Sequence, residues 1–274
     1  MNDPAVHQRI TADWSDSLKE LLPVESFQFF DSVSSTNDVL LERAEANPDI
    51  TTQIHLAVAD FQTSGRGRRG DAWLAPAGKN LLFSLLLPLE LPQQVWPRLP
   101  QVIAWSMGRT IESVIDPYMK IQTKWPNDLY LEGKKLGGIL VETSTRSSRS
   151  FAVVGMGVNV NVKAAEFPDE IREIATSLYE HIGCESNRWY LLGQFLKTFL
   201  TEFPEKTLCF DACLAWVQER DFLVHRNVRV KLIGNSEPLT EGRACGIGNE
   251  GELLVQTSSG QIEKVLSSER LSFS

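Results

Sequence analysis

Residues 121–142, with the sequence IQTKWPNDLYLEGKKLGGILVE, decide the fold class of this chain. Apolar and β-branched side chains flank the turn Leu131–Lys134, so two β-strands joined by that turn are predicted. Further strands are predicted at Ile54–Asp60, Asn80–Leu87 and Phe151–Val162, and helices from Thr36 to Asn47 and at Val102–Ile115, Trp189–Phe203 and Asp211–Arg220. Leu18–Phe30 is apolar without a clear period. Because the strands cluster before the last helices, we expect an α+β fold with a mixed or antiparallel sheet.

The C-terminal segment has a different pattern. Five short β-rich stretches are separated by Gly, Asn, Ser or Pro, at Asn227–Ile233, Thr240–Gly246, Gly251–Gln256, Gln261–Val265 and Arg270–Phe273. Short strands at this spacing are typical of a small barrel. We therefore predict two domains, residues 1–224 and residues 225–274.

Composition and charge exclude several classes of protein. The 274 residues are 42% hydrophobic and 23% charged, which is ordinary for a soluble globular chain. A net charge of −8 argues against broad nucleic-acid binding, because that affinity comes from Lys and Arg neutralising phosphates. Neither a membrane-spanning run nor a secretory leader is visible, so a cytoplasmic protein without a membrane partner is expected. Four cysteines are too few for a disulfide framework, and we expect reduced thiols and no metal site.

The arginine-rich stretch QTSGRGRRG, residues 62–70, is the sharpest candidate site. Its spacing matches the dinucleotide fingerprint G-x-G-x-x-G, but that motif needs a following helix, and a new strand is predicted here instead. Three arginines among three glycines offer guanidinium and backbone N–H donors, which suit a phosphate or a carboxylate. A solvated surface loop is the alternative, and the position directly after a buried strand favours function.

Three further motifs carry polar or small residues. In KWPND, residues 124–128, Lys124 could supply a cation, whereas Asn127 and Asp128 are also typical of an ordinary turn. In VVGMGVNVN, residues 153–161, Gly155 and Gly157 lie on one face of a strand and allow a close approach, or else they mark a β-bulge. In the stretch STN, Ser35, Thr36 and Asn37 are explained by helix capping, and they could also face a pocket.

Taken together, these motifs resemble one family. SSTN, QTSGRGRRG with Trp73 after it, KWPNDLYLEGKKLGGILVE and VVGMGVNVN, in this order between Asp31 and Asn161, are similar to biotin protein ligases of the biotin–[acetyl-CoA-carboxylase] ligase type. The C-terminal segment resembles the SH3-like domain that ends chains of this family. The resemblance implies a mixed-sheet catalytic domain of the biotin/lipoate ligase type, followed by a small SH3-like β-barrel.

The resemblance also implies roles for individual residues. Lys124, Arg66 and Arg68 would be catalytic. The biotin site would comprise Ser35, Thr36, Asn37, Gln62, Gly65, Arg66, Gly67, Arg68, Trp73, Lys124, Gly155 and Gly157. The nucleotide would contact Arg66, Arg68, Arg69, Lys124, Asn127 and Asn159. An adenine-binding loop is expected within Val162–Ala175, with no single residue assigned. Asp116 and Asp128 are both candidates for the base in the acyl transfer.

The implied reaction uses ATP and Mg²⁺ to activate biotin, and the implied partner is the biotin carboxyl carrier protein. A lipoate or octanoate ligase of related fold is the alternative enzyme, although we expect it to lack GRGRRG and KWPND. A DNA-binding regulator is not expected, because 34 residues precede Ser35 and they lack a basic recognition helix. A non-catalytic module of the same ancestry stays open, as does the choice between monomer and homodimer.

Overall fold

The computed structural model describes residues 24–146, 148–231, 240–266 and 270–274. Contacts divide the chain into two compact units, each described by itself below. The first comprises Met1–Glu90, Leu140–Arg172 and Ser177–Thr201, as far as these are described, and the second comprises the rest. Among the described residues, no helix combines the length and the apolar character needed to cross a bilayer.

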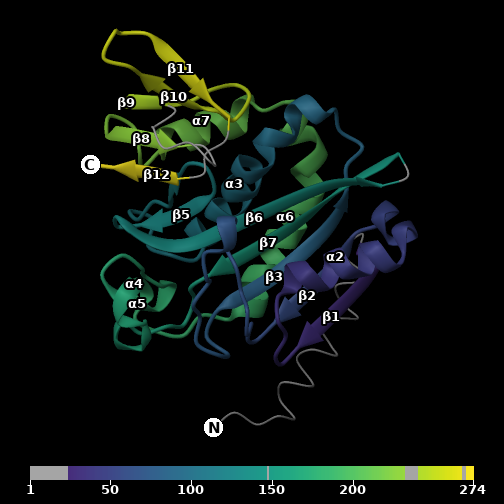
Figure 1. Ribbon diagram of the computed structural model, residues 1–274. Coiled ribbons are helices and arrows are strands. Elements are labelled where there is room, and N and C mark those ends of the chain that lie inside the picture. Colours follow the sequence, from purple (N-terminus) through teal and green to yellow (C-terminus); the bar gives the residue numbers. More distant parts are fainter. Residues whose placement is uncertain (1–23, 147, 232–239, 267–269) are drawn as a thin grey trace. The chain divides into compact units, whose positions relative to one another are not determined.

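The first unit is built on a mixed sheet (Figure 1). Its strands are β1 (Ser26–Phe30), β2 (His55–Ala59), β3 (Leu81–Pro88) and β7 (Arg149–Val158), neighbours in that order. β1 runs parallel to β2, whereas β2 with β3 and β3 with β7 are antiparallel pairs. β6 (Lys134–Arg146) follows β7 in the sheet order, and its residues from Leu140 onward belong to this unit. The predicted α+β fold with a mixed sheet is therefore confirmed.

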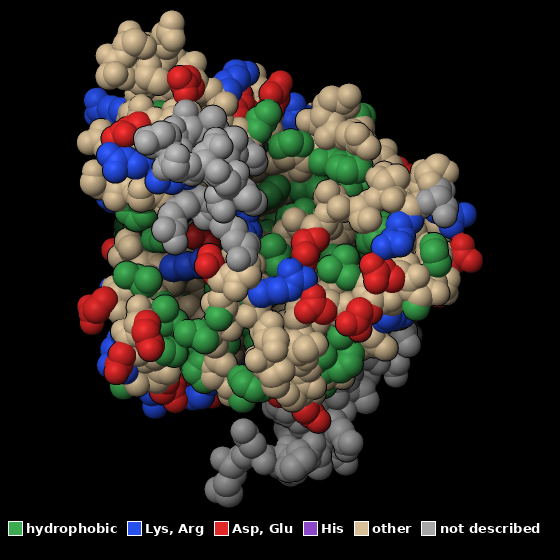
Figure 2. Space-filling model, viewed as in Figure 1, with side chains coloured by type: hydrophobic (Ala, Val, Ile, Leu, Met, Phe, Trp, Pro, Cys, Tyr) green, Lys and Arg blue, Asp and Glu red, His purple; other side chains and the backbone are tan. Residues whose placement is uncertain are grey.

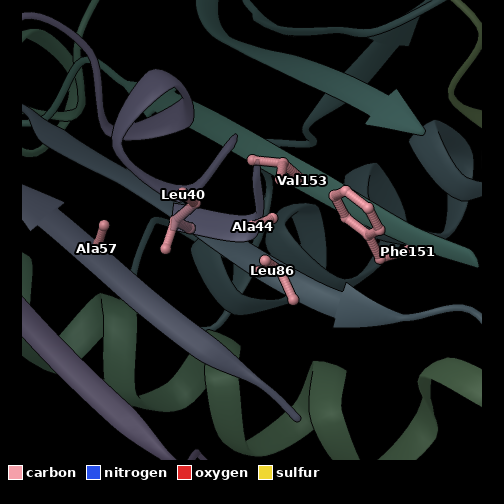
Figure 3. Close-up of a cluster of buried hydrophobic side chains, with 6 residues drawn as sticks. All are labelled: Leu40, Ala44, Ala57, Leu86, Phe151 and Val153. Atoms are coloured by element: carbon pink, nitrogen blue, oxygen red, sulfur yellow. The ribbon is translucent and has the colours of Figure 1, made fainter. Parts of the chain in front are cut away.

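Two helices cover opposite faces of this sheet, α2 (Thr36–Ala46) and α6 (Arg188–Leu208). Side chains of a strand alternate between faces, so each strand serves both helices. Toward α2 lies a buried cluster of apolar side chains (Figure 3), formed by Leu40, Ala44, Ala57, Leu86, Phe151 and Val153. On the other face Phe83 of β3 packs against Phe195 of α6, with ring centroids 5.4 Å apart.

The second unit contains α3 (Leu99–Glu112), β4 (Gln122–Lys124), β5 (Asp128–Leu131), the start of β6, and α7 (Asp211–Glu219). It also contains a five-stranded sheet whose order is β11-β10-β9-β8-β12 and whose neighbouring strands are all antiparallel. These strands are β8 (Asn227–Lys231), β9 (Thr240–Ile247), β10 (Leu253–Gln256), β11 (Ile262–Val265) and β12 (Arg270–Phe273). All five predicted C-terminal strands are present; that they close into an SH3-like barrel stays a prediction.

Short elements complete the described chain. Two short helices, α4 (Asp169–Arg172) and α5 (Leu178–Ile182), follow β7. The 3₁₀ turns are η1 (Pro48–Thr52), η2 (Arg68–Gly70), η3 (Gln93–Arg98) and η4 (Ala164–Glu166). The arginine-rich stretch thus ends in a three-residue 3₁₀ turn, and the next regular element is strand β3, which confirms that the stretch does not open an α-helix as a dinucleotide fingerprint must.

The structure differs from the sequence prediction in two places. β1 was not predicted, and residues 121–142 form three strands rather than two, because β4 and β5 are separate. Pro126 lies between them, and proline has no N–H to donate to a ladder. β1 escaped prediction because both of its faces are covered: Phe29 packs against Trp189 of α6, and Phe30 packs against the cluster under α2. A strand covered on both sides lacks the alternation that identifies a half-buried one.

Candidate active site

The floor of the candidate site is the stretch of β3 and β7 that lies beyond the N-terminus of α2. Under the body of the helix this face of the sheet carries large apolar side chains, but beyond it the face carries Ser84, Gly155 and Gly157. Ser84 pairs directly with Gly155 in an unbroken antiparallel register, so the β-bulge interpretation of these glycines is wrong. A Cβ atom added to Gly155 would lie 2.2 Å from Asn37 Oδ1, and one added to Gly157 would lie 2.6 Å from the Trp73 ring. The glycines therefore permit a close approach, which is made here by the side chains of Asn37 and Trp73; the approach of a ligand stays a prediction.

The first residues of α2 stand over this floor. Ser35 is the N-cap and accepts a hydrogen bond from Asp38 N, which confirms its capping role. Thr36 and Asn37 are buried, and the Ser84 hydroxyl lies 2.6 Å from Thr36 Oγ1 and 2.6 Å from Asn37 Oδ1. Gln62 Oε1 accepts a hydrogen bond of 2.8 Å from Thr36 N. The structure thus brings predicted residues from α2, the β2–β3 connection and β7 into one polar cluster.

The arginine loop, which we define as Gln62–Trp73, is held against this cluster. Its two arms bond to each other, since Trp73 N donates to Gly65 O at 2.8 Å and Gly67 N donates to Asp71 O at 2.7 Å. The Arg66 guanidinium donates to the carboxylates of Asp38 and Glu142, and the hydrogen bond to Asp38 raises the pKa of Arg66. Arg68 is half-buried, and the side chain of Arg69 lies outside the described part of the structure.

Charged groups of both signs lie close together on the protein surface. On the face drawn in Figure 2, Lys and Arg side chains are interspersed with Asp and Glu side chains. Arg66 fits this pattern, because two carboxylates flank one guanidinium. The positive charge of the arginine loop is therefore partly compensated within the protein itself.

A pocket of about 380 Å³ opens beside the arginine loop. Its lining comes from Phe61, Gln62, Thr63, Ser64, Gly65, Ala72, Trp73, Leu74, Ala75, Pro76, Glu166 and Pro168. Glu166 and Pro168 belong to the segment Val162–Ala175, where an adenine-binding loop was predicted. The Glu166 carboxylate accepts a hydrogen bond from Lys163 N, which lowers its pKa, and lies 3.5 Å from Lys79 Nζ. The size and the mixed lining suit a small-molecule ligand.

A buried arginine joins the two ends of the connection between β2 and β3. Arg188 Nη1 lies 2.9 Å from Asp60 Oδ1, directly after β2, and donates to Asn80 O, also at 2.9 Å, directly before β3. Asn80 in turn donates from its side chain to Asn159 Oδ1 at 3.2 Å. Asn159 is buried, so its amide serves this internal network. The strands that bear the arginine loop are thus fixed at the base of that loop.

We predict that Arg188→Met lowers the free energy of unfolding by about 3 to 5 kcal/mol, because removing one partner of a buried pair leaves the Asp60 charge without that partner. Urea unfolding measures the change. The matched control is Arg149→Met, which removes the exposed pair with Asp49 and should cost less than about 1 kcal/mol. Equal losses in the two variants would show that the Arg188 contact does not stabilise the fold beyond a surface pair.

Comparisons with known proteins bear on this site. Residues 29–161 match the Biotin/lipoate A/B protein ligase family, and residues 225–269 match the Biotin protein ligase C terminal domain. A bifunctional ligase/repressor BirA from Bacillus spizizenii is 33% identical over 254 residues, which cover 87% of this chain and 71% of that protein. The chain belongs to the biotin protein ligase family. This confirms the resemblance on which the site residues were assigned.

Two further biotin protein ligase relatives extend the comparison. A biotin–[acetyl-CoA-carboxylase] ligase from Mycobacterium tuberculosis is 29% identical over 221 residues, covering 80% of this chain and 79% of that protein. The biotin protein ligase from Aquifex aeolicus, solved in complex with biotin and ATP, superposes with a TM-score of 0.71 at 30% identity. That superposition covers 91% of this chain and all of the Aquifex chain. The family fold is thus shared over both the mixed sheet and the C-terminal strands.

The remaining predicted site residues lie in the second unit of this biotin protein ligase family member. The Lys124 ammonium is largely buried, 3.3 Å from Tyr130 Oη and 4.9 Å from the centroid of the Phe273 ring. Burial lowers the pKa of Lys124. Asp128 lies 3.8 Å from Lys124 Nζ and 2.7 Å from Lys135 Nζ, and thus pairs with two lysines. Lys135 was not assigned from the sequence, yet its side chain is 34% exposed against 16% for Lys124.

Two other residues of this unit have structural roles. Asn127 donates from Nδ2 to Ile139 O and accepts from Ile139 N, so it ties the KWPND turn to β6, as the turn interpretation predicted. Asp116 is exposed and accepts a hydrogen bond from Tyr118 N at 2.8 Å. Both Asp116 and Asp128 therefore remain candidates for the base, the first exposed and the second paired with lysines.

Sequence analysis missed three residues of the polar cluster in the first unit, namely Asp38, Ser84 and Glu142. Ser84 had a usable signal, because it is the one polar residue in the apolar run Leu81–Leu87. Glu142 ends the stretch LGGILVE, and Asp38 lies in the first turn of α2. Glu142 is 76 residues from its partner Arg66 in sequence, and Asp38 is 28 residues from it, so no local sequence pattern predicts either ion pair.

Proposed function

We propose that this protein activates biotin with ATP and transfers the biotinyl group to a lysine of the biotin carboxyl carrier protein of acetyl-CoA carboxylase. In the first step a biotin carboxylate oxygen bonds to the α-phosphorus of ATP, and the bond to the pyrophosphate leaving group breaks, which gives biotinyl-5′-AMP. In the second step the neutral lysine amine attacks the acyl carbon, AMP leaves with the bonding electrons, and the amine gives up a proton.

One observation carries this proposal: the polar cluster of Thr36, Asn37 and Gln62 stands over a glycine floor, beside an arginine loop. Buried amide and hydroxyl groups supply both donors and acceptors, as a cyclic urea requires. The glycines leave room at the sheet surface for a ligand that displaces the Trp73 ring. The Aquifex relative, which shares this fold, was solved with biotin and ATP bound.

We assign the pocket of about 380 Å³ beside Trp73 to the nucleotide. Arg68 and Arg69 are the candidates for the triphosphate by the family resemblance, and the Arg66 guanidinium pairs with Asp38 and Glu142. We assign Mg²⁺ to the nucleotide as well, because this ion is commonly held by substrate phosphates with one or two carboxylates. It would neutralise charge on the leaving pyrophosphate. In this proposal the buried Asn159 affects the nucleotide site indirectly, through the hydrogen bond that its side chain accepts from Asn80.

The mixed anhydride is easily hydrolysed, so the arginine loop has a second task, the exclusion of water. Ordering a loop over an intermediate costs conformational entropy, which the cross-bonds of Gly65 and Gly67 within the loop reduce. In this proposal the reaction takes place in the cytoplasm, where both ATP and the carrier protein are present.

We predict that Arg68→Ala leaves the fold intact, raises the KM for biotin and lets biotinyl-5′-AMP escape, because the loop loses a charge that meets the intermediate. Release is measured as labelled adenylate that passes a filter retaining the protein. Arg149→Ala, an exposed arginine outside the loop, is the control. Unchanged release from the Arg68 variant would contradict the covering role of the loop.

Isotope exchange between ATP and pyrophosphate tests the whole proposal. We expect exchange that depends on biotin and is not supported by lipoate or octanoate. Exchange with lipoate alone would instead identify a lipoate ligase, the related activity that the family match over residues 29–161 also includes. The match of residues 225–269 to a biotin protein ligase domain favours biotin.

A further inference from the structure

A single carboxylate joins the substrate pocket to the arginine loop. Glu142 extends from β6, and its Oε2 accepts a hydrogen bond of 2.7 Å from Asn37 Nδ2. Its Oε1 accepts a hydrogen bond of 3.1 Å from Arg66 Nη1, and Arg66 Nη2 lies 3.3 Å from Oε2. Three elements that are distant in sequence, α2, β6 and the loop, therefore meet at one side chain.

Glu142 fixes the orientation of the Asn37 amide. The amide N–H₂ faces a carboxylate, which can only accept, so the amide oxygen must face the Ser84 hydroxyl, which donates to it. A rotated amide would set its oxygen against the carboxylate of Glu142. The close approach of Asn37 Oδ1 to the backbone at Gly155 leaves the amide no room to move aside.

This orientation propagates along the cluster. Ser84 has one hydroxyl hydrogen, which is directed to Asn37, so the Ser84 oxygen is left as an acceptor toward Thr36. The single hydroxyl hydrogen of Thr36 then has two acceptors within reach, Ser84 Oγ at 2.6 Å and Gln62 Oε1 at 3.1 Å. Gln62 Oε1 accepts from Thr36 N, which turns the Gln62 amide nitrogen toward Gly65. The donor and acceptor pattern at Asn37 and Ser84 thus depends on the Glu142 carboxylate, whereas the backbone N–H of Thr36 orients Gln62.

The same carboxylate holds the loop. Arg66 donates to Asp38 on one side and to Glu142 on the other, so two negative charges flank one positive charge. Through these two ion pairs the Arg66 guanidinium holds the arginine loop against α2 and β6. It is correspondingly less able to serve as the cation that meets a phosphate.

We propose that Glu142 is a positioning residue of the biotin ligase reaction, acting through Asn37 on the pocket and through Arg66 on the loop. The proposal rests on the function proposed above. In this role Glu142 acts through Asn37 and Arg66, the two residues to which it is hydrogen-bonded, and not by touching the reacting atoms. It sets the hydrogen-bonding pattern that the substrate meets, and it keeps the loop in place before the substrate arrives.

The test compares Glu142→Gln with Glu45→Gln. The first variant keeps size and removes the charge that both Asn37 and Arg66 use. The second removes the charge of a carboxylate of α2 that pairs with Arg146 of β6, so it alters an exposed arginine–carboxylate pair that joins α2 to β6 without involving Asn37 or Arg66. We expect Glu142→Gln to raise the KM for biotin about 10- to 100-fold, the effect of losing hydrogen bonds to a charged group, with a smaller change in kcat. Glu45→Gln should leave both constants unchanged.

A second readout needs no activity. Trypsin cleaves after Arg66, Arg68 and Arg69, so the rate at which peptides from this loop appear reports how often the loop leaves the wall. In the absence of substrates, Glu142→Gln should raise that rate about tenfold or more, whereas Glu45→Gln should not change it. If the wild-type protein shows no biotin-dependent exchange, the proposed function fails, and the proteolysis still decides whether Glu142 holds the loop.

The double variant Asn37→Asp with Glu142→Gln distinguishes loss of this hydrogen bond from a general folding defect. It exchanges the amide and the carboxylate, so the hydrogen bond between the two positions and the total charge are both restored. We expect its biotin KM to lie closer to the wild-type value than that of either single variant. A KM and a cleavage rate that are unchanged in Glu142→Gln, or a double variant no better than the two single variants, would overturn the proposal.

Discussion

Gly155→Ala is expected to reduce the affinity for biotin by about 100-fold or more. The added Cβ would lie 2.2 Å from Asn37 Oδ1, a distance that real Cβ atoms do not tolerate. Asn37 cannot yield, because Ser84 holds its amide oxygen and Glu142 holds its amide nitrogen. Moving it breaks one buried and one partly buried hydrogen bond, and a buried group left unsatisfied costs about 1 to 3 kcal/mol. Isothermal titration with biotin measures the effect.

The matched control for that variant is Val153→Ala, on the same face of β7 but under the body of α2. It opens a small cavity and should lower the free energy of unfolding by about 2 kcal/mol without altering biotin binding by the folded protein. If Gly155→Ala binds biotin normally, the pocket does not lie over this glycine. If Val153→Ala impairs binding as strongly, the effect reports general loosening of the sheet.

Lys135→Ala is expected to lower kcat for adenylate formation by about 100-fold or more, and to do so more strongly than Lys124→Ala. Removing one charge that faces a developing anion typically has an effect of this size. Lys124 carries the assignment from the family resemblance, but its ammonium is shielded by Tyr130 and Phe273. Lys135 pairs with Asp128 at 2.7 Å, more closely than Lys124 does at 3.8 Å, but its side chain is the more exposed, and the prediction rests on that exposure. Because burial also lowers the pKa of Lys124, its charge is lost at a lower pH than that of an ordinary lysine.

Steady-state pyrophosphate release measures both variants, with Lys134→Ala as the control on the opposite face of β6. A cation that meets the phosphate should affect kcat more than biotin binding. A larger loss for Lys124→Ala than for Lys135→Ala would mean that the exposed lysine is not the functional one, and would support the assignment made from the KWPND motif.

Local patterns in the sequence predicted those parts of the molecule that depend on local chemistry. Ser35 was expected as a helix cap, and Asn127 was expected to form a turn; the structure shows both. The paired glycines on one strand face predicted a close approach, which the structure shows at Asn37 and Trp73. In each case the deciding interaction spans few residues or follows from the absence of a side chain.

The parts that escaped prediction depend on pairing across the chain. β1 was missed because its pairing with β2 and its cover on both faces come from distant segments. The partners of Arg66 were missed because a surface-like arginine loop gives no indication of which carboxylates fold against it. The sequence therefore indicated where an anion site was plausible, but it could not show that Arg66 pairs with two carboxylates of the protein itself.

The contacts of Arg188 have a consequence for how this family can vary. Arg188 joins Asp60 and Asn80, so it fixes the two ends of the connection between β2 and β3 independently of the contacts that Gln62 and Arg66 make further along it. Doubling the length of a flexible connection with fixed ends costs only about 0.6 kcal/mol of closure entropy. The length of this connection can therefore vary at little cost to the sheet beneath it, provided that the contacts of Gln62 and Arg66 are kept.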